Sequence, residues 1–209
     1  MQKKLFLNSE ADQMFLRNKE KLFQINYQKD EIFLILNKKI NKNKRFNILE
    51  VGCAGGDRLL FLKEKFPKCK FYGIDPSKKA IKKNTKSNIN LKVGSADKLP
   101  YANNKFDIII FGFCLYLCDN DDLFKIGSEA YRVIKKKSLV IIKDFIQDNV
   151  KYNKYSHLKN IFSRKMNYVR MFTWHPNIKL ESSKKIIDNK NKKLSKKDRT
   201  ISIVCLVKS

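Results

Sequence analysis

The sequence is poor in the residues that build disulfide and metal frameworks. Its 209 residues include five cysteines, an odd number without a Cys-x-x-Cys pair, and only two histidines. A disulfide scaffold and a zinc site of ordinary ligand spacing are both disfavoured, and we predict no metal. The longest nearly apolar run, residues 108–118, is too short to cross a bilayer, and no secretory leader is recognisable. We therefore expect a cytoplasmic protein without a membrane span.

Arginine is also scarce, although the net charge is +26. The 46 basic residues comprise 39 lysines and 7 arginines, and 20 asparagines accompany them. Such an excess, spread along the whole chain, is typical of an AT-rich genome, whereas phosphate recognition favours the guanidinium group. Two dense basic stretches, 78–92 and 184–199, are either solvated surfaces of a helix and a hairpin tip or a binding surface for nucleic acid.

The apolar pattern predicts a single α/β domain over residues 1–209. Helical spacing covers 8–40, and the chain then alternates between short apolar runs and helical patterns. The expected strands are 46–52, 71–75, 90–93, 106–113 and 138–144, the expected helices are 58–66, 78–84 and 121–134, residues 145–174 are irregular, and 178–187 with 200–207 form a hairpin. This order predicts a doubly wound, Rossmann-like, mostly parallel sheet of seven strands with an antiparallel C-terminal hairpin strand. Its site lies at the carboxyl ends of the strands.

The sharpest local signal follows the first expected strand. Gly52, Ala54 and Gly56 lie between that strand and a helix, where small residues let the backbone approach a ligand and helix N–H groups face it. The dinucleotide fingerprint requires glycines at positions 1, 3 and 6, and the sixth position here is Asp57. A nucleotide-type ligand other than NAD is therefore indicated.

With this spacing, residues 50–56 resemble the first motif of the class I S-adenosylmethionine-dependent methyltransferases, acid-x-Gly-x-Gly-x-Gly. Ala54 replaces the middle glycine. The resemblance runs from about residue 8 to residue 145, and further motifs follow in the family's order at Asp75, at 94–100, at 105–117 and at 130–145. It implies S-adenosylmethionine as the cofactor.

The resemblance also implies roles for single residues. Asp75 would accept hydrogen bonds from the ribose hydroxyls, Asp97 would accept one from the adenine amino group, and Phe113 would border the transferred methyl group. In Asp-Pro-Ser, Asp75 is also a good helix N-cap. The predicted cofactor-binding residues are Glu50, Gly52, Cys53, Ala54, Gly56, Asp75, Pro76, Ala96, Asp97 and Phe113.

The sequence gives less specific evidence for the residues that bind the methyl acceptor than for those that bind the cofactor. Methyl transfer from a sulfonium is an in-line displacement, and a hydroxyl or amine acceptor additionally requires a base. His157, His175, Asp144 and Tyr116 are the candidates, each with a structural role as the alternative. Within the domain, the resemblance divides the chain into a helical lid segment (1–44), a cofactor-binding core (45–145), an acceptor-pocket segment (146–177) and the C-terminal hairpin (178–209).

Three functions remain open at this stage. The first is methylation of a small-molecule or glycan acceptor, which the aromatic and cationic residues of 152–176 would suit. The second is an RNA methyltransferase that uses the basic surface, although no separate RNA-binding module is recognisable. The third is a non-catalytic binding subunit, because Ala54 and the Lys137-Ser138 turn depart from the family's glycines. The sequence leaves the acceptor atom and the oligomeric state undetermined.

Overall fold

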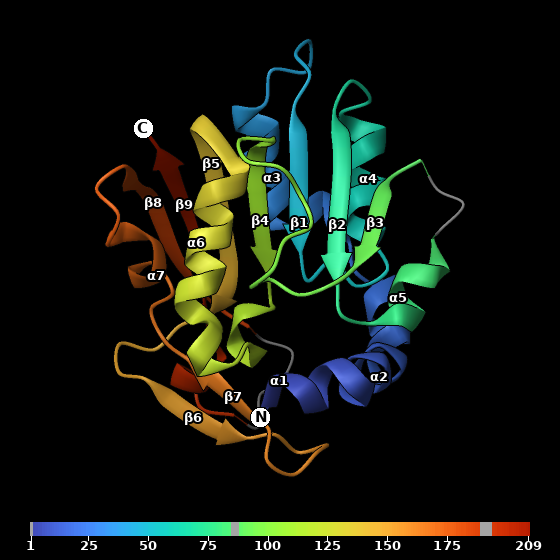
Figure 1. The fold of residues 1–209 in the computed structure, drawn as a ribbon, viewed down its shortest axis with the longest axis vertical. Coiled ribbons are helices and arrows are strands. Elements are labelled where there is room, and N and C mark those ends of the chain that lie inside the picture. The colour runs from blue at the N-terminus through green and yellow to red at the C-terminus, as the bar shows by residue number, and fades with distance from the viewer. Residues whose placement is uncertain (1, 85–87, 189–193) are drawn as a thin grey trace.

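A computed structural model describes residues 2–84, 88–188 and 194–209, and a seven-stranded sheet with helices on both faces forms its centre (Figure 1). The elements are α1 (Gln2–Leu5), the π-helix η1 (Phe6–Glu10), α2 (Ala11–Phe23), η2 (Tyr27–Lys29), α3 (Glu31–Lys39), β1 (Asn47–Val51), α4 (Asp57–Lys65), β2 (Lys70–Asp75), α5 (Lys78–Lys83), β3 (Asn90–Val93), β4 (Phe106–Gly112), η3 (Leu115–Leu117), η4 (Asn120–Asp122), α6 (Leu123–Val133), β5 (Ile134–Phe145), β6 (Lys151–Lys154), β7 (Phe162–Lys165), α7 (Arg170–Thr173), β8 (Ile178–Ile187), η5 (Lys197–Arg199) and β9 (Thr200–Lys208).

The strand order confirms the predicted fold. The sheet runs β3-β2-β1-β4-β5-β9-β8, with β1 to β5 parallel and β9 antiparallel to both β5 and β8. The five parallel strands therefore end at one edge, which is the lower edge in the view of Figure 1, and α1 and α2 lie across it. The order reverses between β1 and β4, so this edge has the crevice where ligands bind in such folds.

The alternation of side chains along the central strands divides the core into two layers. On β4, Ile109 and Phe111 belong to the layer under α6, whereas Ile108 and Ile110 belong to the layer under α3 and α4. All four are at most 4% exposed, as expected for a strand covered on both faces. The buried centre of the sheet therefore holds the carboxyl ends of β1, β2 and β4 in a fixed arrangement.

Strand β5 begins earlier than the sequence predicts. It starts at Ile134 rather than at residue 138, and its pairing with β4 shifts register between Phe106 and Ile108. Lys137 lies at this irregularity with a φ of 57°, the left-handed conformation that a glycine adopts without strain. The departure from the family's glycines is therefore accommodated as an irregularity within a continuous strand.

The segment expected to be irregular, residues 145–174, contains the separate two-stranded sheet β6–β7 and the short helix α7. Strand β6 reads Lys-Tyr-Asn-Lys, so no apolar alternation marks it as a strand in the sequence. Cross-strand pairs such as Tyr152 with Arg164 hold the hairpin together, and Arg164 is buried. Tertiary packing therefore determines this hairpin.

The expected N-terminal helical segment has two parts with different environments. Helix α3 packs into the core through Ile32, Phe33 and Leu36, whereas α1, η1 and α2 lie over the carboxyl edge of the sheet. Asn26 caps η2 between these parts, and its side chain accepts a hydrogen bond from the Gln28 N–H. The first part forms most of the cover of the predicted site, so we use the term lid for residues 2–25.

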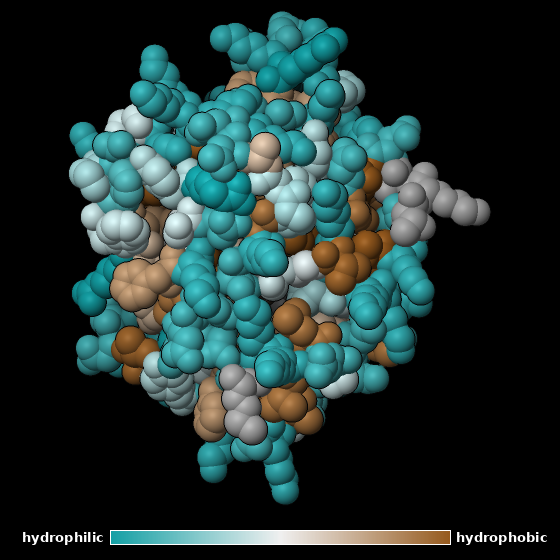
Figure 2. Space-filling view, in the orientation of Figure 1, coloured by the Kyte–Doolittle hydropathy of each residue, from teal (hydrophilic) through white to brown (hydrophobic). Residues whose placement is uncertain are grey.

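The molecular surface is mainly hydrophilic, and apolar side chains form separate patches on the face that Figure 2 shows. Of the two basic stretches, Lys86 and residues 189–193 lie outside the described residues. Among the helices of the described ranges, none is long and apolar enough to span a membrane.

Candidate functional site

The loop after β1 has the backbone conformation that its small residues predict. Gly52 has a φ of 74°, and its N–H donates to the Ile74 carbonyl at 2.8 Å. A Cβ atom on Gly52 would lie 2.4 Å from the Cβ of Cys114, so no other residue fits. Gly56 has a φ of 79° and is the N-cap of α4. The loop thus places backbone without covering side chains at the carboxyl edge of the sheet.

Ala54 is strained where the family motif has its middle glycine. Its φ is 48°, which costs an L-residue with a side chain about 1–2 kcal/mol. We expect Ala54→Gly to raise the free energy of unfolding by about 0.5–1 kcal/mol, because the strain removed exceeds the added entropy of the unfolded chain. Urea denaturation measures this. Ala130→Gly, at a buried helical position of α6, is the matched control and should destabilise the fold. A loss of stability in both variants would contradict the claim that Ala54 is strained.

Asp75 organises this loop from the end of β2. One carboxylate oxygen accepts the Ala54 N–H at 2.8 Å and the other accepts the Ser77 N–H at 2.9 Å. Burial raises the pKa of Asp75 to about 6, against the effect of these two hydrogen bonds, and the nearby Asp12 carboxylate adds to the rise. Each oxygen retains a lone pair, so the carboxylate can still accept hydrogen bonds from two hydroxyl groups.

Asp97 lies across the site from Asp75, in the loop after β3. Its carboxylate contacts the Lys3 ammonium group from α1, and its side chain is 10% exposed. Burial would raise the pKa of Asp97, but the contacts with Lys3 and Ser95 outweigh it, and the pKa is lowered. Asp97 is therefore a carboxylate at neutral pH, as an acceptor for an amino group requires.

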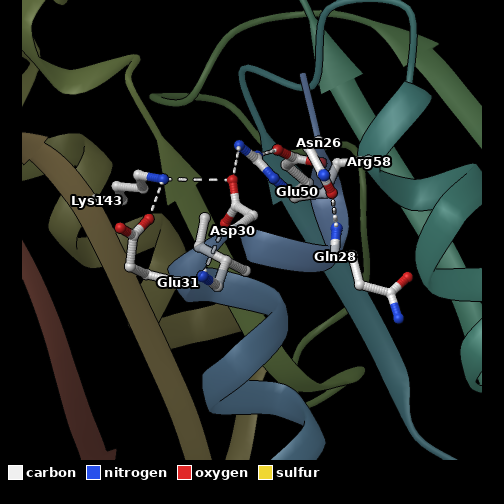
Figure 3. A network of polar contacts seen from close by, with 8 residues as sticks. Asn26, Gln28, Asp30, Glu31, Glu50, Arg58 and Lys143 are labelled. Carbon is white, nitrogen blue, oxygen red and sulfur yellow. Dashed lines mark hydrogen bonds and ion pairs between the residues drawn. The ribbon is translucent and has the colours of Figure 1, made fainter. Parts of the chain in front are cut away.

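Glu50, at the end of β1, is in an ion-pair network that the sequence does not predict (Figure 3). One of its oxygens contacts Arg58 of α4, and Arg58 also lies 3.5 Å from Asp30, the N-cap of α3. Asp30 in turn is 3.3 Å from Lys143 Nζ, which pairs with Glu31 at 2.6 Å. The network joins four elements around the inner wall of the site.

Two atoms of this network have no partner among the described residues. They are Glu50 Oε2 and Arg58 Nε, and Glu50 is only 2% exposed. Burial raises the pKa of Glu50, although the adjacent guanidinium opposes the rise. An arginine two residues after Gly56, followed directly by four apolar residues, is the one sequence signal that could have identified this partner.

A cavity of about 430 Å³ connects these groups. It is lined by Glu50, Gly52, Cys53, Ala54, Asp75, Pro76, Ala96, Asp97 and Phe113, which are nine of the ten predicted cofactor-binding residues; Gly56 does not line it. The sequence analysis missed several further wall residues, among them Arg58, Tyr27 and Lys3. The volume lies within the range of small-molecule and cofactor sites.

The predicted bases are placed differently from one another. Tyr116 lines the cavity, with its ring edge-on to Phe145 at 5.3 Å, and burial raises its pKa. Asp144 is fully buried behind the wall, where it accepts the N–H groups of Leu115 and Phe145 and burial raises its pKa to about 7. His157 is exposed beside Tyr155, and His175 stacks on Tyr131 at 4.0 Å. Neither histidine is among the lining residues.

The expected acceptor-pocket segment does not line this cavity. All lining residues lie between Lys3 and Ile126. Tyr168 and Phe172 are buried in the core, whereas Tyr152 and Trp174 are exposed. The segment instead touches the lid: Gln2 exchanges hydrogen bonds with the Phe162 backbone, and Tyr155 donates to Glu10. Its contribution to the site in this structure is to support the lid.

Comparison with known proteins identifies a methyltransferase domain within the chain. Residues 48–137, fewer than half of the 209, match the model of this domain. The prediction of a methyltransferase is thus confirmed over these residues, and the predicted fold is confirmed as well. The comparisons also support S-adenosylmethionine, the cofactor that the sequence resemblance predicts.

Curated relatives of the methyltransferase domain include a demethylmenaquinone methyltransferase from Geobacillus sp. (strain WCH70), 30% identical over 112 residues. That match covers 50% of this chain and 47% of the relative. A ubiquinone/menaquinone biosynthesis C-methyltransferase of Desulfotalea psychrophila is 29% identical over 92 residues, covering 42% of this chain and 37% of the relative. The chain thus spans about half, or less, of the curated relatives it matches.

Solved structures extend the similarity in fold beyond the methyltransferase domain model. A methyltransferase from Methanosarcina mazei has a TM-score of 0.68 at 15% identity and covers 83% of this chain and 96% of its own. The 1,6-didemethyltoxoflavin-N1-methyltransferase of Burkholderia thailandensis, solved with S-adenosylhomocysteine, has a TM-score of 0.74 at 10% identity, covering 99% and 88%. At these identities the likeness shows the fold, from the lid to β9.

Proposed function

We propose that this protein transfers the methyl group of S-adenosylmethionine to a small, largely apolar acceptor. The observation that carries the proposal is the convergence of the Gly52–Ala54 loop, Asp75 and Asp97 on one cavity. These groups come from the ends of three strands and from no common sequence segment. Their meeting supports the cofactor roles that the sequence resemblance assigns to them.

The residues present fit this cofactor. Two carboxylates, Asp75 and Asp97, suit the ribose hydroxyls and the adenine amino group, and the bare backbone at Gly52 allows close approach. Glu50 and Arg58 also line the cavity, and their carboxylate and guanidinium groups would suit an ammonium and a carboxylate of an amino-acid group.

The bound cofactor supplies an electrophilic methyl group on a sulfonium. The chain contributes alignment and exclusion of water, since an in-line displacement needs no covalent enzyme intermediate. Phe113 has a φ of 57°, unusual for a bulky residue, and its N–H donates to the Lys143 carbonyl at 2.8 Å. This hydrogen bond fixes Phe113 in the cavity wall, where it would orient the acceptor. Tyr116 is the lining residue suited to hydrogen-bonding the acceptor.

The lid contributes a mostly apolar part of the wall, in which Lys3, Asn18 and Lys21 are the polar residues. Its lining residues include Phe6, Leu7, Met14, Phe15, Leu22 and Ile25. Burying a polar sugar against such a wall would leave hydroxyl groups without partners, which costs about 1–3 kcal/mol each. An apolar, ring-bearing acceptor avoids that cost. The names of the curated relatives, quinone methyltransferases, support the same class.

Transfer of tritium from methyl-labelled S-adenosylmethionine tests this function. A reduced demethylnaphthoquinone, a nucleotide sugar and total RNA are supplied separately, with Asp75→Ala as the control of weakened cofactor binding. At a cofactor concentration near the Kd of the wild-type protein, we expect label in the naphthoquinone with the wild type and much less with the variant. Label in RNA or in the sugar, with the quinone unlabelled, would contradict an apolar acceptor.

A further inference from the structure

The lid is fastened to the cofactor-binding loops by polar contacts at two places, near its start and near its middle. Near its start, Lys3 Nζ contacts Asp97 and lies 3.1 Å from Asp122 Oδ2, and the Lys3 N–H donates to Asp119 at 3.2 Å. Further along, Asp12 accepts from the Ser77 hydroxyl at 2.6 Å and from the Lys79 N–H at 2.9 Å. The lid thus lies across the site, held at the Asp97 end and at the Asp75 end.

The two attachments differ in chemistry. The Asp12 attachment consists of hydrogen bonds to a hydroxyl and a backbone N–H at the start of α5. At the other attachment the side-chain contacts of Lys3 are ionic, and its ammonium lies between two carboxylates that are 10% and 11% exposed. The Lys3 N–H and the neighbouring Gln2 side chain add hydrogen bonds to Asp119 and to the Phe162 backbone. Burial disfavours the charged form, but the two carboxylates outweigh it, and the pKa of Lys3 is raised. The Lys3 side chain is 34% exposed, so dissolved ions can reach this attachment.

The segment between the attachments is one continuous helical run from α1 through η1 into α2. It contains the π-helix η1, a geometry that is rare and concentrates at functional sites. Phe6 and Leu7 of η1 line the cavity, whereas Glu10 is buried against Arg17 and Tyr155. A cofactor-sized molecule in the cavity would be partly covered by these residues, so lifting the lid would widen its route of exchange.

We propose that Lys3 is an ionic latch that closes the lid over the Asp97 end of the cavity and sets the rate of cofactor exchange. This inference rests on the proposed function, because it takes the cofactor to occupy the cavity. Asp97 can accept an amino group beside Lys3, since each carboxylate oxygen has two lone pairs. The latch therefore acts on the opening and closing of the lid and not by competing for Asp97.

Exchange kinetics of S-adenosylhomocysteine test the latch. We expect Lys3→Met to accelerate both association and release by about threefold to tenfold, which matches the loss of a partly buried ion pair, and to change Kd by less than about threefold. Raising NaCl from about 0.05 to about 0.5 M should accelerate release from the wild-type protein and leave the variant unaffected, because salt screens the wild-type pair. Radiolabelled S-adenosylhomocysteine chased with unlabelled ligand measures the release rates.

Lys4→Met is the matched control, because Lys4 is exposed one residue away and makes no ion pair within the described ranges. It should behave as the wild type, and Asp122→Asn should reproduce part of the Lys3→Met effect. Equal release rates and equal salt dependence in wild type and Lys3→Met would overturn the latch. A large rise in Kd without faster association would also overturn it, since that result makes Lys3 an ordinary binding residue. Absence of binding by the folded wild-type protein would instead refute the proposed function.

Discussion

Replacing Arg58 with methionine is expected to lower the free energy of unfolding by about 3–5 kcal/mol, the usual result of removing one partner from a buried ion pair. The Arg58 and Glu50 side chains are 11% and 2% exposed, and Asp30 lies on the other side of the guanidinium. Methionine would leave two buried carboxylates facing one another across the gap. Whole domains are stable by only about 5–15 kcal/mol, so this single change brings the protein close to unfolding.

The packing around Arg58 supports an effect of this size. A Cβ atom on Gly112 would lie 2.7 Å from Arg58 Nη1 and 3.3 Å from Glu50 Oε1, so the sheet leaves just enough room for the pair. Lys143 continues the network to Glu31 and holds Phe113 through its own carbonyl. Loss of Arg58 would therefore disturb both the cofactor loop and the wall beside Phe113.

Urea denaturation of Arg58→Met measures the effect, with Lys135→Met as the matched control. Lys135 also pairs with a carboxylate, that of Asp107, but its side chain is 40% exposed, and we expect a change of at most about 1 kcal/mol. The double variant Glu50→Gln, Arg58→Met should recover part of the loss, because it removes the carboxylate that loses its partner, whereas Asp30 keeps its ion pair with Lys143. A change in Arg58→Met no larger than in Lys135→Met would show that the network does not stabilise the fold.

Replacing Asp75 with alanine is expected to weaken binding of S-adenosylhomocysteine by about 1–3 kcal/mol, or roughly 5- to 150-fold, because the ribose hydroxyls lose their acceptor. The variant also leaves the N–H groups of Ala54 and Ser77 without their partner, so the loop itself loses support. Titration calorimetry measures the affinity. Asp148→Ala, which removes an 85% exposed carboxylate, should bind as the wild type does.

The pH dependence of cofactor binding is a second test of the role of Asp75. Its pKa of about 6 is raised by burial and by Asp12, so acid converts it to a neutral carboxyl that has fewer acceptor lone pairs. Bound hydroxyl groups favour the carboxylate; affinity should therefore fall as the pH drops through about 6 and should level off above it. Asp75→Asn cannot titrate, and its weaker affinity should be flat over this range. An identical pH profile in wild type and Asp75→Asn would remove Asp75 from the cofactor site.

The sequence predicted those helices and strands whose apolar side chains recur with a regular spacing within one short segment. The apolar run from Ile108 to Phe111 predicts a strand that is buried on both faces of the sheet. The small residues from Gly52 to Gly56 predict the turn after β1. The hairpin β6–β7 was not predictable, because its strands are polar and its pairing depends on contacts with Asn120 and with the lid. Likewise Lys137 extends β5 in a conformation that its residue type disfavours.

The sequence predicted those site residues that belong to a local motif. Asp75 and Asp97 follow strands, and the parallel sheet brings strand ends together without further information. The partners of these residues were not predictable, because Lys3 reaches Asp97 across 94 positions and Lys143 reaches Asp30 across 113. Such long-range ion pairs depend on side-chain geometry that no local spacing encodes.

The most direct test of the central claim is the thermal unfolding of the protein with S-adenosylmethionine, S-adenosylhomocysteine and, as a control, NAD. At about 100 times its Kd, a ligand that binds only the folded state adds about 2.7 kcal/mol, which raises the Tm of a domain of this size by roughly 5–10 °C. We expect that rise with both S-adenosyl compounds and none with NAD. A cooperative unfolding transition that neither S-adenosyl compound moves, at millimolar concentration, would contradict the assignment of the cavity to this cofactor.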